Sequence, residues 1–354
     1  MQLGLIGLPN RGKTTVFNVL TGFNAQTGYF HKNEPNIAVV EVLDPRVTTL
    51  SELYKPQKTT YSIIEVIDFP GDEEETQKMR FDSPQMKQLD ALCLVLRNFD
   101  DQVLNQSIGE PDPLKELQEI ESEMLINDMQ VAEKRLDKVR LNLQRGVRSA
   151  ENQYEEKVLE KVVNILNAEK PLRTAELLPE EEKVIRGFQL LTIKQVMIII
   201  NSDENRLGKN TNLLEQFHQM GYEAIDIAGK FEMELLSLEP DDAELFLYEM
   251  GISVLARDKI IQMAYRVLGY ISFFTVSNKE VRSWTITKGD NAQEAAGKIH
   301  SDMERGFIRA ECFHYNDLIE YGSEKALKEK GKIRVEGKSY IVNDGDVLFI
   351  RFSV

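Results

Sequence analysis

The stretch GLPNRGKT at residues 7–14 limits the possible folds of this 354-residue chain more than any other part of the sequence. It matches the pattern G-x-x-x-x-G-K-[ST], follows an apolar run at residues 3–8 and precedes a segment with helical spacing. In such a loop, glycines allow backbone N–H groups to surround a β-phosphate, and the helix N-terminus adds positive potential. Lys13 is expected to bridge the β- and γ-phosphates, and Thr14 to offer its hydroxyl to Mg²⁺. The motif predicts a nucleoside triphosphate site.

Four further apolar runs predict more strands of the same sheet. They are short and continuously apolar, and helix-patterned segments separate them, which is typical of a parallel sheet covered by helices on both faces. We therefore expect an α/β fold of the P-loop NTPase kind, with a mostly parallel sheet. The runs are YSIIEVIDFPG (61–71), ALCLVLRNF (91–99), QVMIIIN (195–201) and EAIDIAG (223–229).

A metal anchor and a base-reading pair are expected at the ends of two of these strands. Asp68 ends an apolar run, and its D-x-x-G spacing to Gly71 suits a carboxylate that serves Mg²⁺ and a glycine amide that faces a γ-phosphate. Asn201 and Glu204 follow a later strand, where guanine-binding proteins carry N-K-x-D. Because Ser202 replaces the lysine and a longer glutamate replaces the aspartate, we expect an altered guanine clamp.

A long charged segment from Pro113 to about Lys170 interrupts the predicted sheet. It is nearly free of Gly and Pro, and its apolar residues recur at helical and seven-residue spacing, which predicts two long helices with a coiled-coil-like seam. Gly146 is the expected turn between them. The result is an inserted helical arm, suited either to reaching a partner or to acting as a rigid spacer.

The composition changes again near Tyr270. Strand-like alternation, a turn at residues 343–345 and one amphipathic helix over residues 291–310 indicate a small α+β module. The predicted domains are a nucleotide-binding domain at 1–108 and 188–268, the helical arm at 109–187 and the C-terminal module at 269–354.

Composition limits the compartment and the kinds of site. Cys93 and Cys312 are the only cysteines and lie far apart, which favours a reducing compartment and argues against a disulfide framework or a thiolate metal site. No stretch approaches the roughly 20 apolar residues of a membrane helix, and the first residues lack a basic leader. We therefore expect a cytoplasmic protein without a membrane partner.

Two basic clusters stand out in a chain whose net charge is −15. One lies near the expected arm tip, at residues 134–148, and the other in the C-terminal module, at residues 325–338. Bulk attraction to nucleic acid is excluded by the net charge, so any contact with a polyanion must be local. Each cluster is either solvated surface or a contact site of this kind.

The motifs together resemble a known family nearly end to end. The strings GLPNRGKTT, EPNIAVVEVLDPRVTTLSELYKPQKTT, KEVRSWTI, AAGKIHSDMERGFIRAE and IVNDGDVLFIRF, with the N-x-x-E strand end and the arm, are similar to the YchF subfamily of Obg-like P-loop ATPases. The last segment resembles a TGS domain, which has a β-grasp, ubiquitin-like fold. The resemblance implies a ribosome-associated NTPase that prefers ATP over GTP.

The resemblance also assigns residues to the nucleotide. In relatives the strand end is NVNE, whereas this chain has NSDE, so Asp203 replaces an amide and weakens the preference for ATP. The implied phosphate-binding residues are Asn10, Arg11, Gly12, Lys13, Thr14 and Thr15, the implied adenine-binding residues are Asn201 and Glu204, and a second base-contacting loop contains Ala228 and Gly229.

Both switch regions depart from the family. Relatives carry a Thr that closes on Mg²⁺ where this chain has Lys32, whose ammonium cannot bind a cation but can contact a γ-phosphate. Gly71 is followed by four acids, which begin with Asp72, instead of a glycine-rich loop. Asp72 either orients the attacking water or belongs to a solvated loop, in which case hydrolysis is slow. The candidate catalytic residues are Lys13, Gly71 and Asp72.

These observations favour an ATP-binding, possibly GTP-binding, protein that hydrolyses nucleotide slowly with Mg²⁺ and regulates a ribosome- or RNA-associated process. The alternatives are a non-hydrolysing, nucleotide-gated adaptor and a GTP-specific GTPase; a small-molecule kinase would need an arginine-bearing lid, which we do not find. We expect a monomer. The expected partner contacts are Arg140, Arg145 and Arg148 at the arm tip, with Lys330, Lys332 and Arg334 in the C-terminal module.

Overall fold

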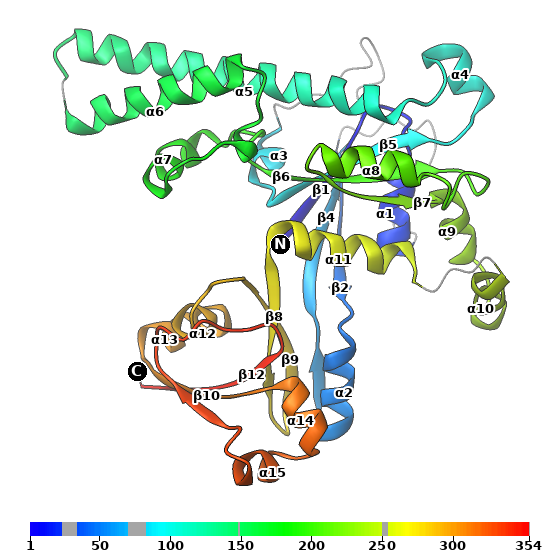
Figure 1. Ribbon diagram of the computed structural model, residues 1–354, viewed down its shortest axis with the longest axis vertical. Helices are drawn as coiled ribbons and strands as arrows, with labels where there is room; N and C mark the ends of the chain where they lie inside the picture. Colours follow the sequence, from blue (N-terminus) through cyan, green and yellow to red (C-terminus); the bar gives the residue numbers. More distant parts are fainter. Residues whose placement is uncertain (23–33, 70–82, 148, 250–253, 354) are drawn as a thin grey trace. The chain divides into compact units, whose positions relative to one another are not determined.

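The computed structural model describes residues 1–22, 34–69, 83–147, 149–249 and 254–353 (Figure 1). The chain forms two compact units, Met1–Val39 with Glu65–Ile260, and Val40–Ile64 with Ile261–Val354. Residues 40–64, which the sequence places in the nucleotide-binding domain, thus pack with the C-terminal residues. The remaining predicted domain bounds stay predictions.

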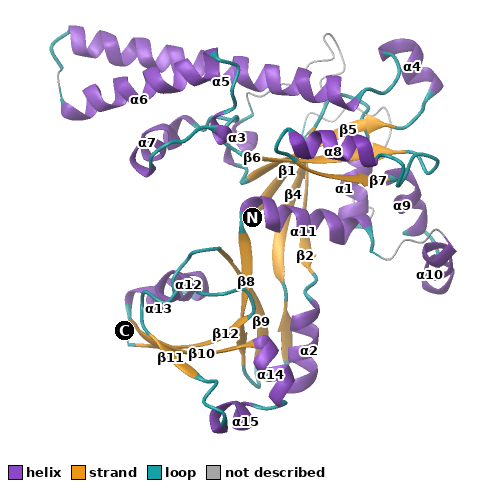
Figure 2. Ribbon diagram, viewed as in Figure 1, coloured by secondary structure: helices purple, strands orange, loops and turns teal. Residues whose placement is uncertain are grey.

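The first unit is built on a six-stranded sheet of order β2-β4-β1-β5-β6-β7 (Figure 2). The pairs β1–β4, β1–β5, β5–β6 and β6–β7 are all parallel, so the carboxyl ends of these strands lie along one edge. The predicted α/β class is confirmed. The strands are β1 (Gln2–Ile6), β2 (Asn36–Val42), β4 (Ser62–Asp68), β5 (Ala91–Asn98), β6 (Gln195–Ser202) and β7 (Glu223–Ile227).

Helices cover both faces of this sheet (Figure 2). Every residue of β5 and all but the first of β6 are buried, as expected for apolar strands covered on both sides. Besides the arm, the helices of this unit are α1 (Lys13–Thr21), α3 (Pro84–Gln88), α4 (Gln102–Ile108), α7 (Pro179–Ile185), α8 (Thr211–Gln219), α9 (Gly229–Leu235) and α10 (Pro240–Glu249), with 3₁₀ helices η1 (Leu172–Thr174) and η2 (Arg186–Phe188).

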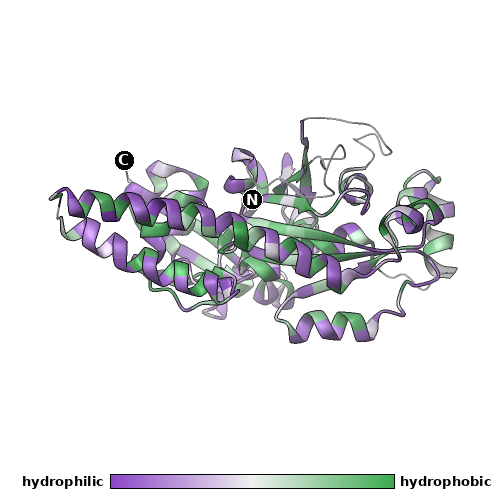
Figure 3. Ribbon diagram, turned by 90° about the horizontal axis from the view of Figure 1, so that it is seen from above, coloured by the Kyte–Doolittle hydropathy of each residue, from purple (hydrophilic) through white to green (hydrophobic). Residues whose placement is uncertain are grey.

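The arm is a hairpin of α5 (Pro113–Gln144) and α6 (Ala150–Asn167), whose polar and apolar residues are visible in Figure 3. Asp112 caps α5 through the Lys115 amide, Pro113 occupies its first turn, and Gly146 takes φ +88° in the turn, which favours glycine. The first half of α5 belongs to the sheet core rather than to the hairpin seam, because Leu117, Ile120 and Met124 pack with strand residues. The seam with α6 begins beyond them, around Ala132.

The second unit holds a sheet of order β11-β10-β12-β8-β9-β3. One apolar cluster packs this sheet against α12 and a second packs it against α2, α14 and α15. The elements are α2 (Pro45–Tyr54), β3 (Lys58–Thr60), β8 (Tyr270–Val276), β9 (Glu280–Thr287), α12 (Ala292–Ile299), α13 (Ser301–Arg305), β10 (Phe307–His314), α14 (Tyr315–Tyr321), α15 (Glu324–Glu329), β11 (Arg334–Glu336) and β12 (Asp346–Phe352). The three boundaries between the units fall within β2, β4 and α11 (Ala256–Leu268).

The prediction of a single amphipathic helix over residues 291–310 was wrong. His300 adopts an extended conformation that ends α12, and its Nδ1 accepts from the Asp302 amide to begin α13. From Phe307 onward the segment is strand β10. The amphipathic pattern therefore covered a helix, a capped second helix and the start of a strand.

Candidate functional site

The phosphate-binding loop connects β1 to α1 at the carboxyl edge of the first sheet. Asn10 and Gly12 both have positive φ, +61° and +85°, and α1 begins directly afterwards at Lys13. Glycine is required at position 12 for two reasons: its φ is positive, and a Cβ there would lie 2.2 Å from Nδ2 of Asn201. A loop with such positive φ values that leads directly into a helix N-terminus is typical of backbone that binds an anion.

Lys13 is buried across the mouth of this loop. Its ammonium donates to the carbonyl oxygens of Gly7 at 2.9 Å and Leu8 at 3.0 Å. These bonds hold the positive charge of Lys13 against the loop backbone, and its expected contact with the β- and γ-phosphates stays a prediction.

Thr14 and Asp68 meet beside the loop, 54 residues apart in sequence. Oγ1 of Thr14 donates to Oδ2 of Asp68 at 2.8 Å, and Nδ2 of Asn36 donates to the same oxygen at 3.1 Å. Asp68 is only 3% exposed, and its other oxygen, Oδ1, is buried with no hydrogen-bond partner among the residues that the structure describes. Burial raises the pKa of Asp68, and the contacts with Asn36, Thr14 and Lys13 oppose that rise.

This donor set fits Mg²⁺. A hard cation takes oxygen ligands and usually keeps several waters, and Oδ1 of Asp68, which no described residue engages, is an acceptor that could hold such a water. The hydroxyl of Thr14 is already oriented by the same carboxylate. Asn36 was missed by the sequence analysis, and its place directly after EP, at the start of β2, was the one available signal.

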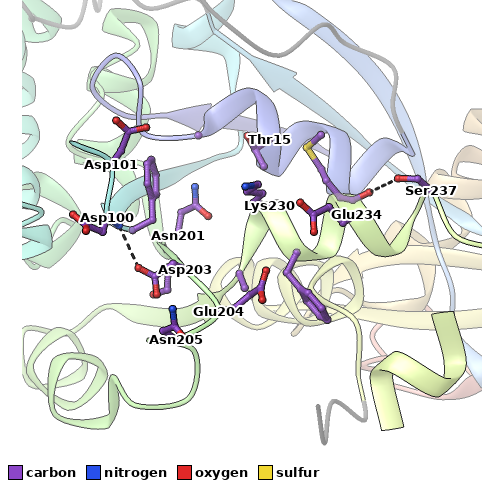
Figure 4. Close-up of a pocket in the computed structure, with 16 residues that line it drawn as sticks. Thr15, Asp100, Asp101, Asn201, Asp203, Glu204, Asn205, Lys230, Glu234 and Ser237 are labelled. Carbon is purple, nitrogen blue, oxygen red and sulfur yellow. Dashed lines mark hydrogen bonds between the residues drawn. The ribbon is translucent and has the colours of Figure 1, made fainter. Parts of the chain in front are cut away.

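A cavity of about 680 Å³ adjoins the loop (Figure 4). Five of the predicted nucleotide residues line it together: Gly12, Thr15, Asn201, Glu204 and Ala228. The sequence analysis missed Phe99, which ends one predicted strand, and Lys230, which follows another. Among the described residues that line the cavity, the acids are Asp100, Asp101, Asp203, Glu204 and Glu234, and the one cation is Lys230. Such a lining favours a neutral ligand group with amino donors over a second phosphate.

Asn201 holds two loops together at the floor of this cavity. Its Nδ2 donates to the carbonyl of Arg11 at 3.1 Å, and its Oδ1 accepts from the Gly229 amide at 3.2 Å. The side chain is 5% exposed. The amide is thus engaged with both loops, and its predicted contact with the base stays a prediction.

Asp203 and Glu204 differ in what they contact. The Asp203 carboxylate accepts from the backbone amides of Asp100 at 3.2 Å and Arg206 at 3.0 Å, so it shapes the loop after β6. Glu204 is exposed at the cavity wall (Figure 4). Of the two acids, Glu204 is therefore the one available to a ligand.

The predicted partner residues are partly neutralised by neighbouring acids. Arg140 forms ion pairs with Glu160 at 2.7 Å and Glu156 at 3.5 Å. In the C-terminal unit, Lys332 pairs with Asp317 at 2.9 Å, and Arg334 contacts Tyr340 at 2.9 Å and Asp346 at 3.5 Å. Both Arg145 and Lys330 are exposed.

Several predicted residues lie outside the described residues. They include the two candidate catalytic residues of the second switch and the cation of the first. These are Lys32, Gly71, Asp72 and Arg148.

Known proteins are similar to this chain in sequence over its full length. A family model described as 50S ribosome-binding GTPase matches residues 2–135, and the model YchF-GTPase_C, described as a protein of unknown function (DUF933), matches residues 270–353. The chain is 37% identical to the Ribosome-binding ATPase YchF of Bacillus subtilis (strain 168), with both proteins covered completely. The chain belongs to the YchF family.

Further relatives agree with this membership. The Ribosome-binding ATPase YchF of Escherichia coli O157:H7 is 34% identical over 100% of this chain and 99% of its own length. The solved structure of the Schizosaccharomyces pombe YchF GTPase superposes with a TM-score of 0.84 at 29% identity, covering 99% of this chain and 97% of that one. The predicted family is confirmed. Within the part of the chain that the structure describes, none of the helices combines the length and apolarity needed to cross a membrane.

Proposed function

We propose that this YchF-family protein binds ATP with Mg²⁺, hydrolyses it slowly and acts as a nucleotide-dependent switch on the ribosome. The observation that carries the proposal is the phosphate loop beside the Thr14–Asp68 pair, whose Oδ1 is free for a metal-bound water. Relatives named Ribosome-binding ATPase support the choice of ligand and partner.

Each residue of the loop has a defined task in this proposal. The bound Mg²⁺ would neutralise charge on the β- and γ-phosphates. Thr14 would hold it directly and Asp68 through a water. Lys13 leaves its two carbonyl acceptors for the phosphate oxygens, and the N-terminus of α1 adds its positive potential.

Recognition of the base is assigned to Glu204 and the cavity around it. A carboxylate accepts from an exocyclic amine, which adenine and guanine both carry, so the acid alone does not separate them. The proposal favours ATP because the lysine and aspartate of the guanine clamp are replaced and because the Asp203 carboxylate is occupied by backbone amides. Because the Asp203 carboxylate is engaged by these backbone amides, the proposal gives Asp203 no contact with the base.

Calorimetric titration with ATP and with GTP tests this proposal. We expect clearly tighter binding of ATP in the presence of Mg²⁺, and Lys13→Ala should abolish binding of both. A preference for GTP would favour the GTP-specific alternative. Unchanged affinity in Lys13→Ala would show that the loop is not the site.

The alternative of a non-hydrolysing adaptor is favoured by one observation, the replacement of the switch threonine by Lys32 together with the acids from Asp72 onward. Single-turnover hydrolysis, with and without ribosomes, separates the two. We expect slow turnover that ribosomes accelerate. Absence of turnover under both conditions would leave the adaptor.

The ribosome contact is proposed to lie at the arm tip and on the C-terminal unit. Arg145 and Lys330 carry the proposal best, since both are exposed, while the charges of Arg140 and Lys332 are partly matched by acids. A ribosome-bound role and two distant, buried thiols suit a cytoplasmic protein.

A further inference from the structure

A buried ion pair joins the phosphate loop to the first turns of the arm helix α5. Nε of Arg11 lies 2.6 Å from Oε1 of Glu116, and each side chain is 9% exposed. Arg11 also donates to the carbonyl of Pro9 at 2.8 Å, which anchors its guanidinium on the α5 side of the loop. The same residue's own carbonyl accepts from Asn201. The loop backbone is thus held from two directions.

The second oxygen of Glu116 is linked to the cavity residue Phe99 through Arg97 of β5. Oε2 accepts from the backbone amide of Arg97 at 2.9 Å. The Arg97 side chain, among the most buried in the protein, donates to the carbonyls of Phe99 at 3.1 Å and Gly109 at 3.2 Å and to Asn105. Phe99 lines the cavity and its ring lies 5.3 Å from the Arg97 guanidinium. The Glu116 carboxylate therefore contacts both Arg11 of the phosphate loop and the backbone of Arg97, whose side chain holds the cavity residue Phe99.

From these contacts we infer that Glu116 is a positioning residue that couples nucleotide binding to the arm helix α5 through Arg11 and β5. The inference rests on the proposed nucleotide-binding function. It adds a defined link between the site and the arm, since Glu116 lies on the same continuous helix as the arm seam.

The chemistry of the pair makes its loss measurable. Burial raises the pKa of Glu116, and the charge of Arg11 opposes that rise, so each partner compensates the desolvation of the other. Removing one partner of a buried pair leaves an uncompensated charge, whereas removing both with neutral residues of similar size is often tolerated. Arg11→Met would leave a bare carboxylate near the phosphates, which it repels.

Nucleotide affinity tests the link through Arg11. In titrations with a fluorescent ATP analogue, we expect Arg11→Met to bind about tenfold more weakly, and Arg11→Met with Glu116→Gln to recover most of that loss because the repelling charge is gone. A double variant that binds as weakly as Arg11→Met would overturn the inference. The double variant carries no unpaired buried charge from this pair, so it also serves if a single variant folds poorly.

Hydrogen exchange tests the coupling to the arm. In the wild type, we expect nucleotide to slow amide exchange in residues 113–120 at least about threefold, and Glu116→Gln to abolish this response. Glutamine keeps an acceptor for the Arg97 amide, so the variant isolates the ion pair. The matched control is Glu155→Gln, which breaks the Arg135–Glu155 pair at 2.6 Å farther along the arm and should leave the response intact.

The outcomes separate this inference from the proposed function. A wild-type protein that binds no nucleotide would overturn the proposed function itself. A wild type that binds nucleotide, together with a Glu116→Gln variant whose α5 response equals that of the wild type, overturns only the coupling.

Discussion

At the scale of single residues, the site depends on side chains that position others. Asn201 connects the phosphate loop to the start of α9, and Asn36 donates to Oδ2 of Asp68, whose other oxygen has no hydrogen-bond partner among the described residues. Such residues act through geometry, and their removal changes affinity without removing a charge.

Replacing Asn201 by Ala should weaken ATP binding by about tenfold or more, because the carbonyl of Arg11 and the amide of Gly229 both lose a buried partner. Calorimetry measures this loss. Asn164→Ala, an exposed asparagine on α6, is the matched control and should bind like the wild type. Equal affinities in the two variants would contradict a role of Asn201 in connecting the phosphate loop to the start of α9.

Metal removal should act through Asp68. Because its Oδ1 is the free acceptor, we expect chelation of Mg²⁺ with EDTA to weaken ATP binding strongly in the wild type. In Asp68→Asn, the difference between the Mg²⁺ and EDTA titrations should shrink several-fold, since a neutral amide holds a metal-bound water less well. Direct Mn²⁺ binding, measured by electron paramagnetic resonance, gives an independent readout. A full metal response in the variant would rule Asp68 out.

At the scale of elements, α5 is anchored to the first unit by buried carboxylates at two positions along the helix. Glu116 binds near its start, and Asp128 accepts from the amides of Leu191 at 2.9 Å and Thr192 at 2.7 Å and from the Thr192 hydroxyl at 2.7 Å. The second anchor holds the segment that leads into β6. The arm helix α5 is thus tied both to the carboxyl end of β5 and to the segment that enters β6.

Asp128→Asn should lower the free energy of unfolding by about 1–3 kcal/mol, because an amide has one acceptor oxygen for three buried donors. Urea denaturation measures the difference. Asp137→Asn, an exposed position on the same helix, controls for the loss of charge and should change stability little. Equal effects of the two substitutions would show that the anchor contributes nothing.

A separate ion pair stabilises the C-terminal unit, where Arg46 of α2 lies 2.8 Å from Asp344. Burial by itself would raise the pKa of Asp344, but hydrogen bonds from Arg46 and the Ser272 amide outweigh it, and the pKa lies below its usual value. The stabilisation is therefore full above the ordinary Asp pKa of about 4 and is lost as pH falls through the lower folded value. In Arg46→Met, urea stability should decline less between pH 6 and about 3 than in the wild type. An identical decline would contradict this.

At the scale of the whole molecule, an acidic protein must meet a polyanion through a few local charges. The net charge of −15 would oppose the proposed ribosome binding, and several of the basic residues that offset it locally are already paired within the protein. Contact with the ribosome would then be weak and salt-dependent, with Arg145 and Lys330 contributing most.

Arg145→Glu and Lys330→Glu should each reduce co-sedimentation with ribosomes several-fold, and added salt should weaken the wild type in the same direction. The matched control is Arg309→Glu, an equal change of charge at an exposed arginine of β10 that the proposal does not use. Equal losses in all three variants would indicate a nonspecific charge effect and would remove the assigned contacts.

The sequence alone determined the local features of this protein. The loop at residues 7–14, the buried strands and the helical hairpin follow from motif and periodicity, because each depends on residues close together in the chain. The predicted family followed from the same strings. The helix predicted over residues 291–310 failed because one extended residue, His300, is enough to end a helix without breaking the amphipathic pattern.

Only the tertiary structure decided which distant residues meet. Asn36 and Asp68 lie 32 positions apart, Asn201 and Arg11 lie 190 apart, and Glu116 looked like any other acid on a charged helix. The same holds for residues 40–64, whose packing with the C-terminal unit has no local signal. Burial and pairing of polar groups depend on what the fold brings next to them, and spacing along the chain carries no information about that.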